Sequence, residues 1–454
     1  MTKERKLFGT DGIRGIANRD LTAELTLKVG RAAAEFLVSD KSRKGRIIVG
    51  RDPRPSGDFI ESAIIAGILS SGHNVLRAGI ITTPAVALLT KVLNLDGGIV
   101  ISASHNPLDD NGIKFFSKEG QKLTDEQEKL MEDYILGQEM LDNNKYPTGA
   151  DVGRCFNMDD ACEVYLNHVL KDLHLNLEGL RIAVDCANGS PSVVIPDALK
   201  RVGADVVSFN TNTSGEDINQ NCGSTHPEAL RRIVFESNAD IGFSYDGDGD
   251  RVIACDGMGR ILDGDVIMAF CALKMFEKGL LKNNCLVTTV MANMGLEKAL
   301  KHYGITVYKT AVGDRYVLEK MAEVGAILGG EQSGHIIFKD LSPTGDGLVS
   351  TLRFLWLIVE TGCEINEIHK IVRKYPQVLK NVPVKDKTKI MNSEFVKRSI
   401  LDVENQLKGD GKVVVRPSGT EPVIRVMVEA KTEEIARSFV DKLSEIISRY
   451  HESN

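Results

Sequence analysis

Three aspartates alternate with glycines in the stretch Asp246-Gly-Asp-Gly-Asp250. Because carboxylates at this spacing repel one another, the pattern indicates a bound cation, and an all-oxygen donor set favours Mg²⁺ or Ca²⁺. An EF-hand loop is excluded, since Arg251 stands where that loop has glycine and Gly257 where it has glutamate. Mg²⁺ commonly binds carboxylates together with phosphate oxygens, and Arg251 suits a phosphate. The stretch predicts a magnesium site beside a phosphate, with a solvated acidic turn as the alternative.

Ser104 follows the apolar residues 99–101, in the segment Ala103-Ser-His-Asn-Pro107. A serine held on such a turn can present its hydroxyl as a nucleophile. Serine, asparagine and proline are also the usual residues of ordinary turns, so the segment taken alone favours a plain turn. His105 and the more distant His335 have no partners at metal-ligand spacing, and each fits a structural role as well as a functional one.

Three further loops combine glycine with arginine. The segment Arg416-Pro-Ser-Gly-Thr-Glu-Pro422, with Arg425 beyond it, offers N–H groups, two hydroxyls and guanidinium groups that match a phosphate. A plain hairpin turn is an almost equally good interpretation. The glycine-rich segment 9–15, which contains Arg14, is a weaker signal of the same kind, and Gly313-Asp-Arg315 is weaker still.

The motifs of several other enzyme classes are absent from the sequence. It contains no G-x-x-x-x-G-K-[ST], no complete G-x-G-x-x-G, no G-x-S-x-G and no H-E-x-x-H. Nucleotide kinases, dinucleotide dehydrogenases, α/β-hydrolases and zinc proteases therefore lose support.

The composition is that of an ordinary globular chain, and 454 residues suffice for about two to four domains. The 56 Lys and Arg against 63 Asp and Glu give a net charge of -7, which argues against a broad nucleic-acid surface. No apolar run approaches the ~18–20 residues that cross a bilayer, and no signal-peptide apolar region follows the charged first residues. The eight cysteines form no C-x-x-C pair, which favours a reducing compartment. We expect a cytoplasmic protein without a nucleic-acid or membrane partner.

The strands and helices around these loops form a diverged repeat. Three times a β-branched strand is followed by a helix, a glycine and a second apolar strand, beginning at residues 45–50, 180–185 and 285–290. The glycine after each helix is expected to be a left-handed C-cap. Each copy then reaches another strand that ends in a polar loop, at residues 102–107, 246–251 and 329–335. Because ligands collect at the strand ends of α/β sheets, we expect three similar α/β domains that share one site; a coincidence of common βα alternation is the alternative.

The remainder of the chain predicts a smaller unit. Residues 412–415 and 423–428 read as strands, and Thr432 is a plausible N-cap of a final helix. We expect an α/β fold class with mixed sheets in the three similar domains, followed by an α+β domain. The expected boundaries are 1–150 with the serine loop, 151–256 with the aspartate loop, 257–374 with the loop at Glu331, and 375–454.

Together these loops resemble the α-D-phosphohexomutase superfamily. The matching stretches follow the family order from Phe8 to about Val428, and as a set they are highly specific: residues 8–15 (FGTDGIRG), 98–107 (GIVISASHNP), 110–116 (DNGIKFF), 221–226 (NCGSTH), 246–251 (DGDGDR), 312–317 (VGDRYV), 329–335 (GGEQSGH) and 416–422 (RPSGTEP). Ser342-Pro343 departs from the family where a threonine is expected, outside these stretches.

The resemblance implies roles for individual residues around one cleft. Ser104 would be the phosphoserine that donates and recovers a phosphoryl group, and its phosphate would complete the shell of one Mg²⁺ held by Asp246, Asp248 and Asp250. The remaining catalytic side chains would be Lys114 and His105 in acid–base chemistry, Arg251 beside the phosphate and Arg14 as an orienting group. The substrate-binding set would be Glu331 and Ser333 on sugar hydroxyls, and Arg416, Ser418, Gly419, Thr420 and Arg425 on the distal phosphate.

The resemblance also implies a reaction. A phosphoryl group would pass from phosphoserine to a hexosamine monophosphate, and the bisphosphate formed would turn end for end before returning the other phosphate. The expected substrates are glucosamine 6-phosphate and glucosamine 1-phosphate, precursors of cell-wall amino-sugar nucleotides. A phosphomannomutase/phosphoglucomutase is the alternative within the enzymes, and a non-catalytic sugar-phosphate sensor is the alternative outside them. The sequence leaves the oligomeric state open, a homodimer being one option.

Overall fold

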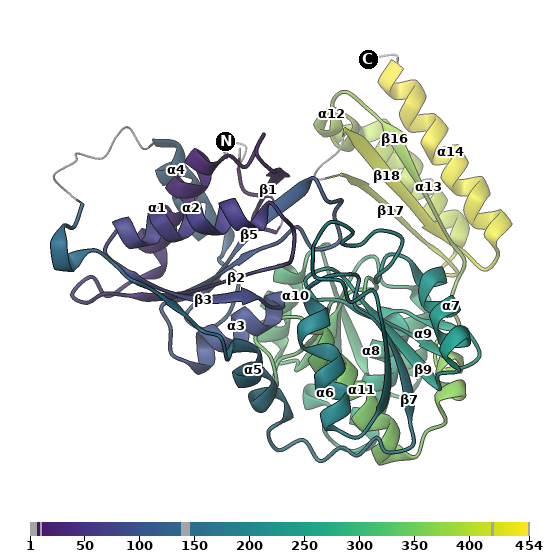
Figure 1. The fold of residues 1–454 in the computed structure, drawn as a ribbon. Helices are drawn as coiled ribbons and strands as arrows, with labels where there is room; N and C mark the ends of the chain where they lie inside the picture. Colours follow the sequence, from purple (N-terminus) through teal and green to yellow (C-terminus); the bar gives the residue numbers. More distant parts are fainter. Residues whose placement is uncertain (1–6, 10, 138–145, 419–421, 453–454) are drawn as a thin grey trace.

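A computed structural model of the chain describes residues 7–9, 11–137, 146–418 and 422–452. Four β-sheets follow one another along the described chain, each with its own helices (Figure 1). None of the described helices combines the length and apolar character needed to span a membrane.

The first unit is a mixed, six-stranded sheet with the order β1-β5-β4-β2-β3-β6. Strands β4, β2, β3 and β6 run parallel, whereas β5 is antiparallel to both of its neighbours. Its strands are β1 (Ile13–Ile16), β2 (Arg46–Arg51), β3 (Asn74–Ile80), β4 (Gly97–Ile101), β5 (Asp110–Ser117) and β6 (Cys155–Asn157). Its helices are α1 (Ala23–Leu37), α2 (Gly57–Ser70), α3 (Thr83–Val92) and α4 (Asp125–Gly137). The sheet thus continues to β6, beyond residue 150 where the sequence predicted the domain boundary.

The second unit has the sheet order β11-β10-β9-β7-β8. Strand β9 is parallel to β7 and antiparallel to β10. The strands are β7 (Arg181–Asp185), β8 (Asp205–Phe209), β9 (Ile241–Tyr245), β10 (Val252–Asp256) and β11 (Ile261–Leu262), and the helices near them are α5 (Ala161–Leu170), α6 (Ile195–Arg201) and α7 (Pro227–Ser237).

The third unit repeats this arrangement in the order β13-β12-β14-β15, with β14 parallel to β12 and antiparallel to β15. Its strands are β12 (Cys285–Thr289), β13 (Thr306–Thr310), β14 (Leu328–Gly330) and β15 (Ile336–Phe338), and its helices are α8 (Gly264–Glu277), α9 (Met294–His302), α10 (Asp314–Val324) and α11 (Gly347–Thr361). In each of these three units a parallel strand, β4, β9 or β14, leads into a strand antiparallel to it, which confirms the predicted repeat.

The glycines predicted to end the repeated helices do so. Gly72, Gly203 and Gly304 each lie two residues beyond the last helical residue, with φ angles of 88°, 92° and 77°. These left-handed conformations are the ones that glycine adopts at no steric cost at a helix C-terminus.

The C-terminal unit is an antiparallel sheet, β16-β18-β17, with an apolar core of its own. Its strands are β16 (Gln377–Pro383), β17 (Lys412–Pro417) and β18 (Val423–Glu429), and its helices are α12 (Lys387–Asn392), α13 (Glu394–Leu407) and α14 (Glu433–Glu452). The Thr432 hydroxyl caps α14 at the Ile435 N–H, as the sequence predicted. A large core joins the second and third units and one face of the first, and Figure 1 shows the yellow-green C-terminal unit to one side of them.

Candidate active site

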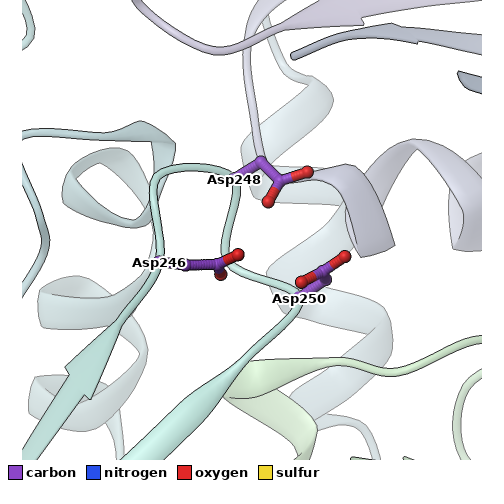
Figure 2. Close-up of side chains that lie close together, drawn as sticks. All are labelled: Asp246, Asp248 and Asp250. Atoms are coloured by element: carbon purple, nitrogen blue, oxygen red, sulfur yellow. The ribbon is translucent and has the colours of Figure 1, made fainter. Parts of the chain in front are cut away.

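The three aspartates lie in the turn between β9 and β10, where their carboxylates face one another (Figure 2). One oxygen of each lies within 4.8 Å of one oxygen of the others, and no side chain of the three is more than 6% exposed. The intervening Gly247 permits a close approach, because a Cβ there would come within 2.8 Å of the Ser104 carbonyl oxygen. The loop therefore packs directly against the serine loop of the first unit.

The electrostatics of the three aspartates fit a divalent cation. Burial, together with Asp250 and Asp248, raises the pKa of Asp246 well above its ordinary value. Among the described residues, no hydrogen bond reaches the buried oxygens Asp248 Oδ1 and Asp250 Oδ1. Buried carboxylate oxygens without partners are costly, and a hard cation coordinated by them removes that cost.

Ser104 is held in a strained conformation at the centre of the site. Its φ of 54° is in the left-handed region, which a residue with a Cβ adopts only when its surroundings enforce it. The Ser104 N–H donates to Ser102 Oγ at 2.9 Å, and the Asn219 side-chain amide donates to its carbonyl oxygen at 2.9 Å. Its hydroxyl donates to Asp246 Oδ2 at 2.5 Å and lies 3.1 Å from His105 Nδ1. The serine and aspartate loops are thus one site.

A fully buried ion pair, Asp52 and Arg54, holds the serine loop in place. The sequence analysis did not identify this pair. Arg54 Nε donates to Asp52 Oδ2 at 3.0 Å, and its Nη2 donates to the carbonyls of Asn106 at 2.7 Å and Ser104 at 3.2 Å. Asp52 Oδ2 also accepts from Ser102 Oγ at 2.6 Å. One sequence feature could have identified the pair: Asp52 and Arg54 lie in the segment just after strand β2, as the other polar loops lie just after their strands.

Lys114, on β5, brings a positive charge to the aspartates. Its side chain is 1% exposed, and its Nζ lies 2.7 Å from Asp248 Oδ2, 3.2 Å from Asp11 Oδ2 and 3.5 Å from Asp250 Oδ2. Burial alone would lower the pKa of Lys114, but Asp11, Asp248 and Asp250 outweigh it and raise that pKa. The lysine is therefore a fixed cation in this arrangement.

Three further basic side chains surround Ser104: Arg14, Arg251 and His105. Arg14 Nη2 contacts Asp11 Oδ2 at 2.5 Å, and its Nη1 donates to Asn106 Oδ1 at 3.3 Å. The Arg251 N–H donates to Asp246 Oδ1 at 3.1 Å, and its side chain is 23% exposed. Burial, Arg251 and Arg14 lower the pKa of His105 to about 4, so its imidazole is neutral at pH 7 in this arrangement.

The third unit contributes the loop between β14 and β15. Glu331 Oε1 accepts a hydrogen bond from the Gly313 N–H at 3.2 Å, and Ser333 is exposed. His335, which the sequence left between a structural and a functional role, is buried with Nδ1 3.7 Å from Asp250 Oδ2 and Nε2 3.5 Å from Asp314 Oδ2. No sequence pattern indicated the contact between His335 and Asp250.

The C-terminal unit contributes two opposed arginines. Arg416 on β17 and Arg425 on β18 are directly paired across the ladder, and both are half-buried. Burial and Arg425 lower the pKa of Arg416, while the carboxylate of Glu331 acts in the opposite direction. Ser418 is buried, and its N–H donates to the Val423 carbonyl at 3.0 Å. Gly419 and Thr420, predicted to bind the same phosphate, lie outside the described residues.

Models of the phosphoglucomutase/phosphomannomutase family match four successive segments of the chain. They correspond to α/β/α domain I at residues 5–141, domain II at 163–259, domain III at 263–375 and the C-terminal domain at 379–446.

Among solved structures, the chain resembles a phosphoglucomutase/phosphomannomutase family protein of Burkholderia thailandensis, with a TM-score of 0.80, 23% identity and coverage of 98% of this chain and 97% of the other. It also resembles the N-acetylphosphoglucosamine mutase of Aspergillus fumigatus in complex with GlcNAc-6P and magnesium, with a TM-score of 0.71, 17% identity and coverage of 99% and 97%. At these identities the likeness concerns the fold.

Much closer sequence relatives exist. The phosphoglucosamine mutase of Carboxydothermus hydrogenoformans is 50% identical over 98% of this chain and 99% of its own, and that of Desulforamulus reducens is 48% identical over 97% and 99%. With this identity and with all four domains matched, the chain belongs to the phosphoglucomutase/phosphomannomutase family of phosphohexomutases.

Proposed function

We propose that the chain interconverts glucosamine 6-phosphate and glucosamine 1-phosphate, with Ser104 as the phosphoryl carrier. The observation that carries this proposal is the Ser104 hydroxyl, 2.5 Å from one of three buried aspartates and on the same site as Lys114. The choice of glucosamine is supported by the relatives at 48–50% identity, which are phosphoglucosamine mutases. The eight cysteines are free thiols, and we place the reaction in the reducing cytoplasm.

We propose that Asp246, Asp248 and Asp250 hold one Mg²⁺, together with a phosphate oxygen on Ser104. Asp248 Oδ1 and Asp250 Oδ1, which accept no hydrogen bond from the described part of the chain, support this assignment. When bound, the ion neutralises negative charge on the phosphoryl group during transfer.

In the first half-reaction, a hydroxyl oxygen of the sugar monophosphate forms a bond to phosphorus as the bond from phosphorus to Ser104 Oγ breaks. The products are a sugar bisphosphate and the serine hydroxyl, so the sugar's proton must pass to Ser104 Oγ. His105 Nδ1, 3.1 Å from that oxygen, is placed to carry the proton. Lys114 and Arg251 provide fixed positive charge for the equatorial oxygens of the phosphoryl group.

In the second half-reaction the bisphosphate presents its other phosphate to Ser104. The Ser104 hydroxyl attacks that phosphorus, the bond to the sugar oxygen breaks, and the serine proton returns to the sugar. Arg14 orients the groups at the serine in both steps. Net chemistry is an isomerisation, because the phosphate gained and the phosphate lost are equivalent.

The non-reacting end must be held in both orientations of the bisphosphate. We assign Glu331 and Ser333 to sugar hydroxyls, and Arg416, Ser418, Gly419, Thr420 and Arg425 to the distal phosphate. Two arginines directly opposite each other gain from an anion placed between them, which supports this assignment.

A coupled assay with the 1-phosphates of glucosamine, glucose and mannose tests the proposal. We expect the highest kcat/KM for glucosamine 1-phosphate, with side activity on glucose 1-phosphate. Intact mass spectrometry should detect an added phosphate of about 80 Da on wild-type protein and none on Ser104→Ala. A mannose 1-phosphate kcat/KM equal to or above that of glucosamine 1-phosphate would replace the proposal by a phosphomannomutase, and no turnover of any sugar phosphate would favour a sensor.

A further inference from the structure

The segment Gly313-Asp-Arg315 joins β13 to α10, and the proposed reaction gives it no role. Each of its three residues nevertheless contacts a group outside its own helix. Gly313 contacts the loop at Glu331, while Asp314 and Arg315 contact the first unit. Because this segment contacts both the loop at Glu331 and the first unit next to the site, it is a candidate for positioning the two relative to each other.

Asp314 is the inner contact with the first unit. Its Oδ2 lies 2.6 Å from Lys122 Nζ, and both side chains are at most 10% exposed. The same Nζ lies 2.5 Å from Asp11 Oδ1, whose other oxygen lies 3.2 Å from Lys114 Nζ. Charges of opposite sign thus alternate from Asp314 to Lys114, the lysine at the three aspartates. Buried pairs of this kind are strongly destabilised when one member is removed, because the other charge stays buried.

Arg315 is the outer contact with the first unit. Its Nη2 donates to Glu128 Oε1 at 2.6 Å, and its Nη1 donates to the carboxylate of Asp125. Both acceptors lie in the first turn of α4, and the arginine side chain is only 11% exposed. A guanidinium shared by two carboxylates fixes orientation as well as distance.

Gly313 carries the contact to the sugar-binding loop. Its N–H donates to Glu331 Oε1, the carboxylate assigned to sugar hydroxyls. Its φ is 135°, which a residue with a side chain rarely adopts, and a Cβ there would come within 3.2 Å of the Tyr316 ring. The bond therefore depends on the local backbone that Asp314 and Arg315 anchor.

We propose that Gly313, Asp314 and Arg315 form a clasp that positions the third unit, and with it Glu331, against the Lys114 centre of the first unit. The clasp proposal rests on the proposed function, because that function assigns sugar binding to Glu331 and phosphoryl transfer to the site of Lys114. In that role the three are positioning residues. Misplacement of reacting groups by about 1 Å can cost about a hundredfold in rate, so loss of the clasp should affect turnover.

Three variants and one control test the clasp. Asp314→Asn and Arg315→Gln should each lower kcat for glucosamine 1-phosphate by about tenfold to a hundredfold, with KM changed much less because the phosphate is held by the C-terminal unit. Arg315→Lys, which keeps the charge, should recover most of the lost kcat. Glu323→Gln, on an exposed pair with Lys320 of the same helix, should leave kcat unchanged.

A second measurement does not depend on the reaction. Without substrate, amide hydrogen exchange in α4 should rise in Asp314→Asn and Arg315→Gln but not in Glu323→Gln. If the wild-type protein turned over no sugar phosphate, the proposed function would fail while this result could still stand. Unchanged exchange in α4, or wild-type kcat in a folded Arg315→Gln, overturns the clasp. Arg315→Gln, which leaves Lys122 with both carboxylates, decides the test should Asp314→Asn not fold.

Discussion

The reaction centre and the C-terminal unit use opposite arrangements of charge. Around Ser104, acidic and basic side chains alternate. The Nζ of Lys114, for example, lies within 3.5 Å of three carboxylates. In the C-terminal unit, two cations, Arg416 and Arg425, stand directly opposite each other across a β-ladder. The first arrangement balances most of its charge within the protein, whereas the second concentrates charge of one sign.

The two regions also differ in how they join the rest of the chain. The first and second units meet the third through buried contacts at the site, and a common core extends through all three. The C-terminal unit has a separate core, and Lys412 and Glu429 connect it to the third unit. Lys412 Nζ donates to the Val290 carbonyl in the loop before α9 at 3.0 Å, and the N–H of Met294, the first residue of α9, donates to Glu429 Oε2 at 2.9 Å.

This contrast suggests a way in which one site can position groups precisely and still release an intermediate that must turn end for end. The groups proposed to act on the transferred phosphoryl are already held by buried contacts, and such preorganisation avoids reorganisation during the chemical step. The groups proposed to hold the other end include two arginines that face each other, and an anion bound between them would offset their repulsion. The comparison predicts that the same kind of substitution has different consequences in the two regions.

Ser104→Ala should have the largest effect, because it removes the proposed carrier itself. We expect turnover to fall by at least about a thousandfold, as for other nucleophile deletions, with little change in fold. Steady-state kinetics on the pure variant measures this. Ser62→Ala, an exposed serine on α2 of the same unit, is the control. Near-normal turnover in Ser104→Ala with Ser102 intact would remove Ser104 from the mechanism.

Lys114→Met should destabilise the fold as well as stop the reaction. The substitution leaves Asp11 and Asp248 buried without their shared cation, and removing one partner of a buried ion pair costs about 3–5 kcal/mol. Urea unfolding in the presence of chelator measures the free energy of unfolding. Lys298→Met, whose lysine is exposed beside Asp410, should cost much less. An equal loss in the free energy of unfolding in the two variants would contradict the inference that Lys114 balances the charge of the buried carboxylates.

Divalent metal should stabilise the same centre. Mg²⁺ at a hundred times its Kd should add about 2.7 kcal/mol to the free energy of unfolding, and chelation should abolish turnover reversibly. Thermal unfolding with and without Mg²⁺ tests this independently of activity. Asp248→Asn should lose the stabilisation, whereas Asp441→Asn, an exposed carboxylate on α14, should keep it. Full turnover in chelator-treated protein would exclude a catalytic metal.

Local pattern was sufficient to predict the loops but not their partners. The serine, aspartate and glutamate loops stand out because polar and turn-forming residues interrupt apolar strands, and the glycine C-caps follow from steric rules alone. By contrast, Lys122 and Asp314 are far apart in sequence, and neither carries a pattern that says which charge it meets. The left-handed φ of Ser104 cannot be read from local pattern either, since tertiary contacts such as those of Arg54 and Asn219 help to hold it.

The C-terminal unit should respond differently, beginning with substrate binding. Arg416→Ala should raise KM for glucosamine 1-phosphate about tenfold to a hundredfold, since a hydrogen bond to a charged group contributes roughly 1.5–3 kcal/mol. Lys431→Ala, on an exposed pair with Asp410 in the same unit, should leave KM unchanged. An unchanged KM in Arg416→Ala would mean that the loop faces away from the sugar phosphate.

The smallest effect should have the opposite sign to that of Lys114→Met. Arg416 lies directly opposite Arg425, and like charges at such positions are destabilising, so Arg416→Gln should raise the free energy of unfolding by about 0.2–1 kcal/mol in phosphate-free buffer. Inorganic phosphate should stabilise the wild type more than the variant, because the anion offsets the repulsion only where both arginines remain. Arg437→Gln, which breaks an exposed helical pair with Glu433, should lower stability slightly and leave the phosphate effect intact. If Arg416 lowers the stability of the free protein but strengthens phosphate binding, its role is in binding. A loss of stability in Arg416→Gln would therefore contradict the contrast between the two regions.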